Sequence, residues 1–163
     1  MNNCKSFKPS IDNSSNILIL GSMPGSKSLE QQQYYAHPQN RFWKVMGYIC
    51  DEPKLNEFNY NLKLKTLLKN NIALWDTIKT CNRKGSLDSD IKNEIPNDLR
   101  NLLENYPNIK TICLNGNKSF VAFKKYFPDL MGKYCCHKMP STSPANAKYC
   151  LNKLIKEYSK FIK

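Results

Sequence analysis

Four short apolar runs constrain the fold of this 163-residue chain more than any other feature. They are NILIL at 16–20, NIALWDTI at 71–78, IKTICLN at 109–115 and KYCCHKM at 133–139. Each run is continuous and is flanked by Gly, Pro, Asn or Ser, a pattern typical of strands that are buried on both faces of a parallel sheet. We therefore expect about four mostly parallel strands.

Segments with helical spacing of apolar residues lie between and after these runs. They cover 40–49, 62–68, 91–103 and 118–127, and a last helix in which apolar residues recur at three and four from Leu151 to Ile162. Only 1–15 and 51–61 resemble linkers. Strands that alternate with helices predict one α/β domain over residues 1–163, a three-layer α/β/α sandwich around a mostly parallel sheet of about four strands.

The sequence gives little sign of membrane or metal binding. The first 16 residues are polar, and no run approaches the roughly 20 apolar residues that cross a bilayer, so we expect a cytoplasmic protein with no membrane partner. The seven cysteines form no CxxC pair, and Cys135, Cys136 and His137 alternate along an expected strand, so they cannot converge on one ion. We expect free thiols and neither a metal nor a cofactor.

The net charge of +12 points to an anionic partner. Such an excess attracts DNA through release of counterions. Only three of the 25 basic residues are Arg, however, and Lys and Asn are abundant throughout, so compositional bias is an alternative origin of the charge.

The loop after the first run, GSMPGSKS at 21–28, partly matches a phosphate-binding loop of the type GxxxxGK[ST]. Lys27 and Ser28 fit that pattern, and Asp76 could hold magnesium. However, Ser26 replaces the second glycine, and Pro24 removes a backbone donor. A nucleotide hydrolase is therefore a minor alternative.

Three segments carry a more specific resemblance. GSMPG at 21–25, HPQNRFW at 37–43 and MPSTSPANA at 139–147 occur in this order, and the first and last follow expected strands. Together they resemble the uracil-DNA glycosylase superfamily, and GSMPG with STSPAN resembles its hypoxanthine-DNA glycosylase branch. The resemblance covers 16–162 and implies a monofunctional glycosylase that hydrolyses the N-glycosidic bond of a deaminated base, most simply hypoxanthine in deoxyinosine.

The resemblance also implies roles for individual residues. Met23 stands where related uracil enzymes have a water-positioning asparagine, and Asn40 is the catalytic residue expected to take that role. The expected base-binding residues are Gly21, Ser22, Met23, Pro24, Gly25, Tyr35, His37 and Asn115, with the Tyr35 ring stacking on the extruded base. The expected DNA-binding residues are Ser141, Thr142, Ser143, Pro144 and Asn146. The expected partner is double-stranded DNA that contains a deaminated base, and the expected state is a monomer.

Several of these residues have a purely structural alternative. Asn40 could cap the helix at 41–49, His37 could fix the turn before Pro38, and Asn146 could cap the last helix. Asp76 could polarise water or cap the turn that follows it, and the serines could be ordinary turn residues. For the whole protein, the alternatives are a uracil or xanthine enzyme of the same fold and a DNA-binding module without catalysis.

Overall fold

A computed structural model describes residues 2–162. Its central sheet has four strands, β2 (Ile17–Gly21), β3 (Ile72–Asp76), β6 (Thr111–Asn115) and β7 (Cys135–Met139). They lie in the order β3-β2-β6-β7, and every neighbouring pair is parallel. The four strands expected from the apolar runs are confirmed.

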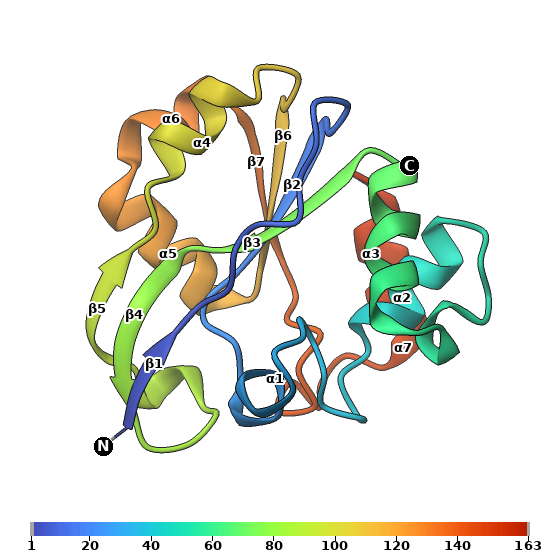
Figure 1. The fold of residues 1–163 in the computed structure, drawn as a ribbon, viewed down its shortest axis with the longest axis horizontal. Helices are drawn as coiled ribbons and strands as arrows, with labels where there is room; N and C mark the ends of the chain where they lie inside the picture. The colour runs from blue at the N-terminus through green and yellow to red at the C-terminus, as the bar shows by residue number, and fades with distance from the viewer. Residues whose placement is uncertain (1, 163) are drawn as a thin grey trace.

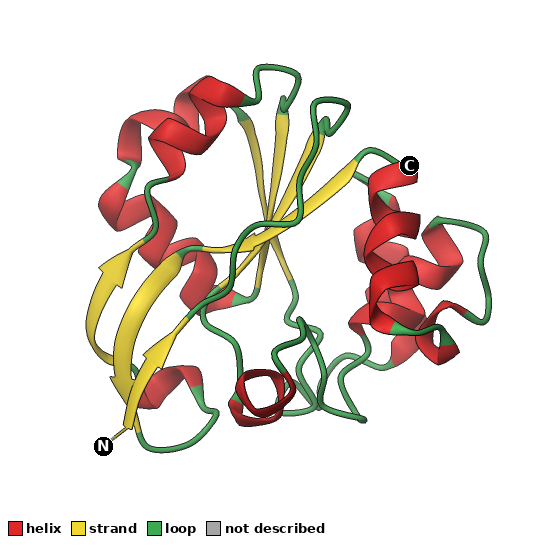
Figure 2. Ribbon diagram, viewed as in Figure 1, coloured by secondary structure: helices red, strands yellow, loops and turns green. Residues whose placement is uncertain are grey.

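Helices cover both faces of this sheet (Figures 1 and 2). One face carries α2 (Phe42–Ile49), α3 (Tyr60–Lys69) and α7 (Leu151–Ser159), and the other carries α4 (Leu99–Asn105), α5 (Asn117–Tyr126) and α6 (Pro128–Lys133).

Alternate residues of each strand face opposite layers. In β2, Ile17 and Ile19 pack in the core on the α2 and α7 side, and Leu18 and Leu20 pack in the core on the α4 and α5 side. The three-layer α/β/α sandwich is confirmed.

A second, antiparallel sheet was not expected. It consists of β1 (Asn2–Lys5), β4 (Ile78–Arg83) and β5 (Lys92–Pro96), in the order β1-β4-β5. The expected helix over 91–103 is therefore wrong in its first half, because α4 starts only at Leu99. β5 is mostly exposed and contains no apolar run, so its pairing with β4 rather than its own composition makes it a strand.

The segments expected as linkers also contain structure. β1 occupies part of 1–15, and a short 3-10 helix, η1 (Leu55–Glu57), interrupts 51–61. Leu55 is fully buried against α2, which explains why this connection is ordered.

The loops that follow Gly21, Asp76, Asn115 and Met139 meet at one end of the parallel sheet, because the carboxyl ends of parallel strands share an edge. Figure 1 shows this end at the bottom, with α1 (Ser26–Gln31) directly after β2. A second 3-10 helix, η2 (Asp88–Asp90), lies between β4 and β5.

Within residues 2–162, no helix has the length and apolar character needed to cross a bilayer. The described residues also contain no grouping of three or more His, Cys, Asp or Glu side chains suited to a metal ion. His137 instead stacks on Phe161, with ring centroids 3.7 Å apart.

Candidate active site

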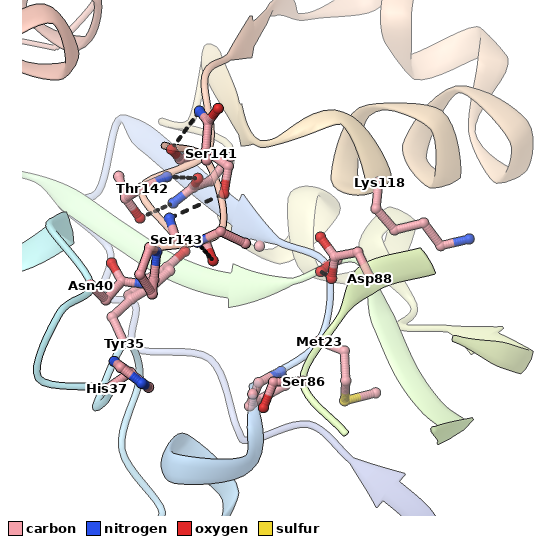
Figure 3. A pocket seen from close by; sticks show the side chains of 18 of the residues that line it. Met23, Tyr35, His37, Asn40, Ser86, Asp88, Lys118, Ser141, Thr142 and Ser143 are labelled. Atoms are coloured by element: carbon pink, nitrogen blue, oxygen red, sulfur yellow. Dashed lines mark hydrogen bonds between the residues drawn. The ribbon is translucent and has the colours of Figure 1, made fainter. Parts of the chain in front are cut away.

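A cavity of about 1080 Å³ opens at the carboxyl edge of the parallel sheet. Every residue that the sequence placed in the site lines it, from the turn at 21–25 to the loop at 141–146. In Figure 3, Tyr35, His37 and Asn40 lie on one side, and Ser86 and Asp88 lie on the other. The fold therefore brings the three motif segments to one place, and the role of each residue remains a prediction.

The turn at 21–25 presents backbone N–H groups. The carbonyls of Gly21 and Ser22 accept hydrogen bonds from the N–H groups of Thr77 and Ile78, at 2.8 and 3.0 Å. No hydrogen bond among the described residues uses the N–H groups of Ser22, Met23 or Gly25. These donors are free to bind an acceptor atom, and their binding of a base stays a prediction.

Met23 contributes little polar chemistry to this turn. Its side chain is 6% exposed and packs with Ile78 and Ala122 in a small hydrophobic cluster. The residue thus anchors the turn and also belongs to the cavity lining.

A buried arginine lies beneath the same turn and was missed at the sequence level. Arg83, the last residue of β4, is 1% exposed and donates a hydrogen bond to the carbonyl of Pro24. Its Nε and Nη1 atoms have no hydrogen-bond partner among the described residues. A buried guanidinium stays charged, so Arg83 places a positive charge under the turn. Its position next to Gly85 and Ser86 in a charged loop gave no sequence signal of burial.

The N-cap of α2 is Arg41 rather than Asn40, but the Asn40 side chain still bonds to the first residue of the helix. Its Oδ1 accepts a hydrogen bond from the Phe42 N–H, at 2.9 Å, at the start of α2. A carbonyl oxygen has a second lone pair, and the half-buried side chain lines the cavity. The helix contact therefore orients the amide and leaves it able to hold a water.

Tyr35 is held in place by stacking within the protein. Its ring lies 3.9 Å from that of Phe42, with an interplanar angle of 17°, so one face is covered. Its φ of 54° directs the chain between α1 and α2. Burial and, to a smaller extent, the Asp76 carboxylate raise the pKa of Tyr35 well above its usual value, an effect that the Asn115 amide partly offsets. Only the second face remains for the predicted stacking on a base.

His37 forms the turn contact that was its structural alternative. Its Nδ1 accepts a hydrogen bond from the Gln39 N–H at 3.1 Å, and the residue is exposed at the cavity mouth. The other ring nitrogen remains for a phosphate or a base.

Asn115 is oriented by two hydrogen bonds with one residue. Its Nδ2 donates to Thr142 Oγ1, and its Oδ1 accepts from the Thr142 N–H, both at 3.1 Å. Both residues are buried. Gly116 has a φ of +96°, and a Cβ there would lie 3.2 Å from the Ser141 Cβ, so glycine is required for the close approach of this loop.

A second functional residue missed at the sequence level is Arg41. Its guanidinium donates to the carbonyls of Thr142, Ser143, Asn146 and Tyr149. One planar cation thus holds the whole loop after β7 against the start of α2. The signal that could have revealed it was an arginine beside Asn40 in a chain whose basic residues are mostly lysine.

The remaining loop residues bond mainly within the loop. Ser141 Oγ accepts from the Ser143 N–H, and Ser143 Oγ accepts from the Ala145 N–H. Each hydroxyl keeps its own hydrogen for donation, as a phosphate contact requires. Asn146 donates to the Ser141 carbonyl and does not cap α7, whose N-cap is Cys150, so that alternative is wrong.

Asp76 ends β3 at the bottom of the cavity and is 4% exposed. Its carboxyl group has a pKa raised to about 7, mainly by burial and to a smaller extent by nearby Asp88, while Arg83 opposes the shift. No hydrogen bond from the following turn reaches this carboxyl among the described residues, so the capping alternative is wrong.

Asp88 lies against the motif turn, where its Oδ1 accepts from Ser22 Oγ at 2.6 Å. The residue as a whole is exposed, but the dense surroundings of its carboxyl group raise its pKa, and the Ser22 hydrogen bond and Arg83 lower it. Ser86, two residues earlier, accepts from the Ser26 N–H at 2.8 Å. Two hydrogen bonds thus hold the segment that contains η2 against residues 22–26.

The side chains needed for a phosphate-binding loop are engaged elsewhere. Lys27 pairs with Glu30 on the surface at 3.6 Å, and the Ser28 hydroxyl accepts from the Ala36 N–H at 3.0 Å. The geometry therefore does not support the nucleotide hydrolase alternative.

Comparison with known proteins agrees with this geometry. Residues 9–162 match the model of the uracil DNA glycosylase superfamily. A protein from Methanosarcina acetivorans named hypoxanthine DNA glycosylase is 41% identical over 150 residues, which cover 91% of this chain and 92% of that protein. A protein of the same name from Methanosarcina barkeri is 44% identical over 113 residues, which cover 69% and 71%.

A solved structure shares the fold. The solution NMR structure of a candidate uracil DNA glycosylase from Methanosarcina acetivorans superposes with a TM-score of 0.85 at 38% identity, over 99% of this chain and 97% of that one. The chain therefore belongs to the uracil DNA glycosylase superfamily.

Proposed function

We propose that this protein is a monofunctional DNA glycosylase that removes hypoxanthine from deoxyinosine by hydrolysis and leaves an abasic site. The observation that carries the proposal is the pairing of Asn40 and Asn115 on one cavity, each oriented by a hydrogen bond to a neighbouring backbone N–H. The names of the two relatives support hypoxanthine as the base.

The proposed reaction uses water as nucleophile. Breaking an N-glycosidic bond builds positive charge on the sugar and negative charge on the departing base. In this proposal Asn40 holds the water, the free N–H groups of the turn at 21–25 stabilise the base, and Asn115 recognises its edge. These steps require no metal, cofactor or Schiff-base lysine.

A base within a duplex must be extruded to enter such a cavity. In this proposal the hydroxyls of Ser141 and Ser143, which keep a free hydrogen, contact the backbone of the extruded nucleotide, and the net charge of +12 attracts duplex DNA. We expect a cytoplasmic monomer that acts on double-stranded DNA.

The test is an alkali-developed cleavage assay, without added metal, on labelled duplexes that carry one inosine, uracil or xanthine. We expect wild type to cleave the inosine strand and Asn40→Ala to lose about a hundredfold or more in rate while it still binds the duplex. Undiminished cleavage by Asn40→Ala would remove this residue from the mechanism.

A matched control separates catalysis from the helix contact of Asn40. Asn59 caps α3 through a hydrogen bond from the Leu62 N–H and lies outside the cavity lining. Asn59→Ala should cost about 1 kcal/mol of stability and leave excision unchanged.

The same cleavage assay distinguishes the alternative functions. Cleavage of uracil or xanthine instead of inosine would favour the related enzyme, and no cleavage of any base would favour a binding module.

A further inference from the structure

Two polar atoms of the cavity lack a hydrogen-bond partner among the described residues, Asp76 Oδ2 and Tyr35 Oη. Both are buried, and both residues line the cavity. Buried polar atoms are nearly always bonded, so neighbouring exceptions in one cavity mark where a ligand supplies the missing partners.

Gly21 lies beside both the Asp76 carboxyl group and the Tyr35 hydroxyl. It pairs with Asp76 in the register of β2 and β3, and a Cβ on Gly21 would lie 2.5 Å from Asp76 Oδ1 and 3.2 Å from Tyr35 Oη. The φ of Gly21 is not in the left-handed region, so the glycine is needed for space rather than for its backbone conformation. The carboxyl group therefore lies over the start of the turn that presents free N–H groups.

The charged and titratable groups around Asp76 come from several elements. Asp88 of η2 faces it with like charge, Arg83 of β4 faces it with opposite charge, and the tyrosines are Tyr35, Tyr34 and, from α3, Tyr60. Arg83 forms no ion pair with it, and burial is the dominant effect that brings the pKa of Asp76 to about 7. The carboxyl group thus exchanges its proton near neutral pH.

We propose that Asp76 is a specificity residue whose protonated form donates a hydrogen bond to an acceptor atom of the extruded base. This inference rests on the proposed function. A 6-oxopurine offers three acceptors, O6, N3 and N7, and Asn115 alone does not satisfy them. A departing base gains negative charge, which a neutral acid stabilises and a carboxylate repels. The proton remains on Asp76, and no covalent bond of the side chain changes.

The experiment is single-turnover excision from an inosine duplex, with enzyme in excess, between pH 5.5 and 9. We compare wild type with Asp76→Asn, which has nearly the same shape and a donor that does not titrate. The wild-type rate should fall as pH rises through about 7, by up to tenfold per pH unit, because Asp76 ionises. Asp76→Asn should lack this fall and exceed the wild-type rate at pH 8.5.

Asp88→Asn provides the matched control, because it removes the like charge and leaves Asp76 in place. It should move the midpoint of the fall to lower pH and keep its shape. A fall of the same size and midpoint in Asp76→Asn would overturn the proposal, as would a wild-type rate that is constant or that rises over this range. Thermal unfolding verifies that both variants fold.

A binding measurement separates this inference from the proposed function. If wild type cleaves no base, the proposed function fails, and the role of Asp76 is tested on a duplex with 2′-fluoro-deoxyinosine, which resists cleavage. Tighter wild-type binding below pH 7 that is absent in Asp76→Asn would support the inference. Equal affinities of the two proteins at every pH would overturn it.

Discussion

Asn115 and Asp76 end the two strands that flank β2, one on each side of Gly21, yet their side chains are in opposite states. Both groups of the Asn115 amide are bonded to Thr142. The Asp76 carboxyl has an unpartnered, buried Oδ2 and a pKa raised to about 7 by burial. One cavity wall is therefore oriented by the protein, whereas the other holds a buried acid with a raised pKa and a free oxygen atom.

This difference follows from the loops that meet each strand. The loop after β7 crosses over β6, where hydrogen bonds from Arg41 hold it and Thr142 contacts Asn115. Within residues 2–162, no loop supplies a donor to the buried Oδ2 of Asp76, which is flanked instead by like-charged Asp88 and by Arg83. Four measurements test this difference between the two cavity walls.

The largest expected effect is on stability. The folded pKa of Asp76, about 7, lies above the usual 3.8, so the folded state binds more protons between these values, and stability decreases as pH rises from 4 to 7. Asp76→Asn should remove this loss and gain, relative to wild type, about 4 kcal/mol in unfolding free energy between pH 4 and 8, at about 1.4 kcal/mol per pKa unit. Urea unfolding at both pH values measures this gain, and equal pH dependence in both proteins would contradict the assignment.

Asn115→Ala should come next. It removes the side chain proposed to recognise the base and leaves the buried Thr142 N–H and hydroxyl without Asn115, so excision of hypoxanthine should drop by about a hundredfold. The fall in rate above pH 7 should persist, because Asp76 is untouched. Wild-type excision rates in this variant would show that Asn115 serves only to hold the loop.

Arg41→Lys tests the hydrogen bonds by which Arg41 holds the loop after β7. A lysine cannot reach the carbonyls that the guanidinium bridges, so stability should decrease by about 2 kcal/mol, and binding of the inosine duplex should weaken. Thermal unfolding and fluorescence anisotropy measure the two effects. Arg100→Lys, which alters an exposed ion pair with Asp129 away from the cavity, is the control and should leave DNA binding unchanged.

Thr142→Val should have the smallest effect. It removes the hydroxyl that accepts from Asn115 Nδ2 and keeps the N–H that donates to Asn115 Oδ1. We expect a fewfold decrease in single-turnover excision rate, about 1 kcal/mol, with an unchanged pH profile. A shifted pH profile would mean that the contact between Thr142 and Asn115 influences the ionisation of Asp76, so the two sides of the cavity would not be independent.

Much of the fold followed from local patterns. Four buried parallel strands leave continuous apolar runs, so their number, position and order along the chain were predictable from the sequence. The antiparallel sheet was not, because β5 is an exposed strand that becomes ordered only through pairing with β4. The same reason explains the error over 91–103.

The candidate site divides in a similar way. The three motif segments identified the loops that line the cavity, and the rule that ligands bind at the carboxyl ends of parallel strands predicted that these loops would meet. The roles of Arg41 and Arg83 were missed, because each donates to carbonyl groups of a loop far away in the chain, and only the choice of arginine over lysine at position 41 hinted at such a contact. Every residue has a main-chain carbonyl group, so the residue types do not show which carbonyl an arginine will bind.

The layer architecture, the family resemblance and the residues that face the cavity could all be predicted from the sequence, because each depends on short segments and on their order. The bonding and protonation of each side chain depend on the folded arrangement. Asp76 was equally compatible with capping a turn, and its burial beside Asp88, over a glycine that leaves room for it, made it an unpaired acid. The protonation of a buried group depends on charges and solvent exclusion from distant parts of the chain, which only folding brings together.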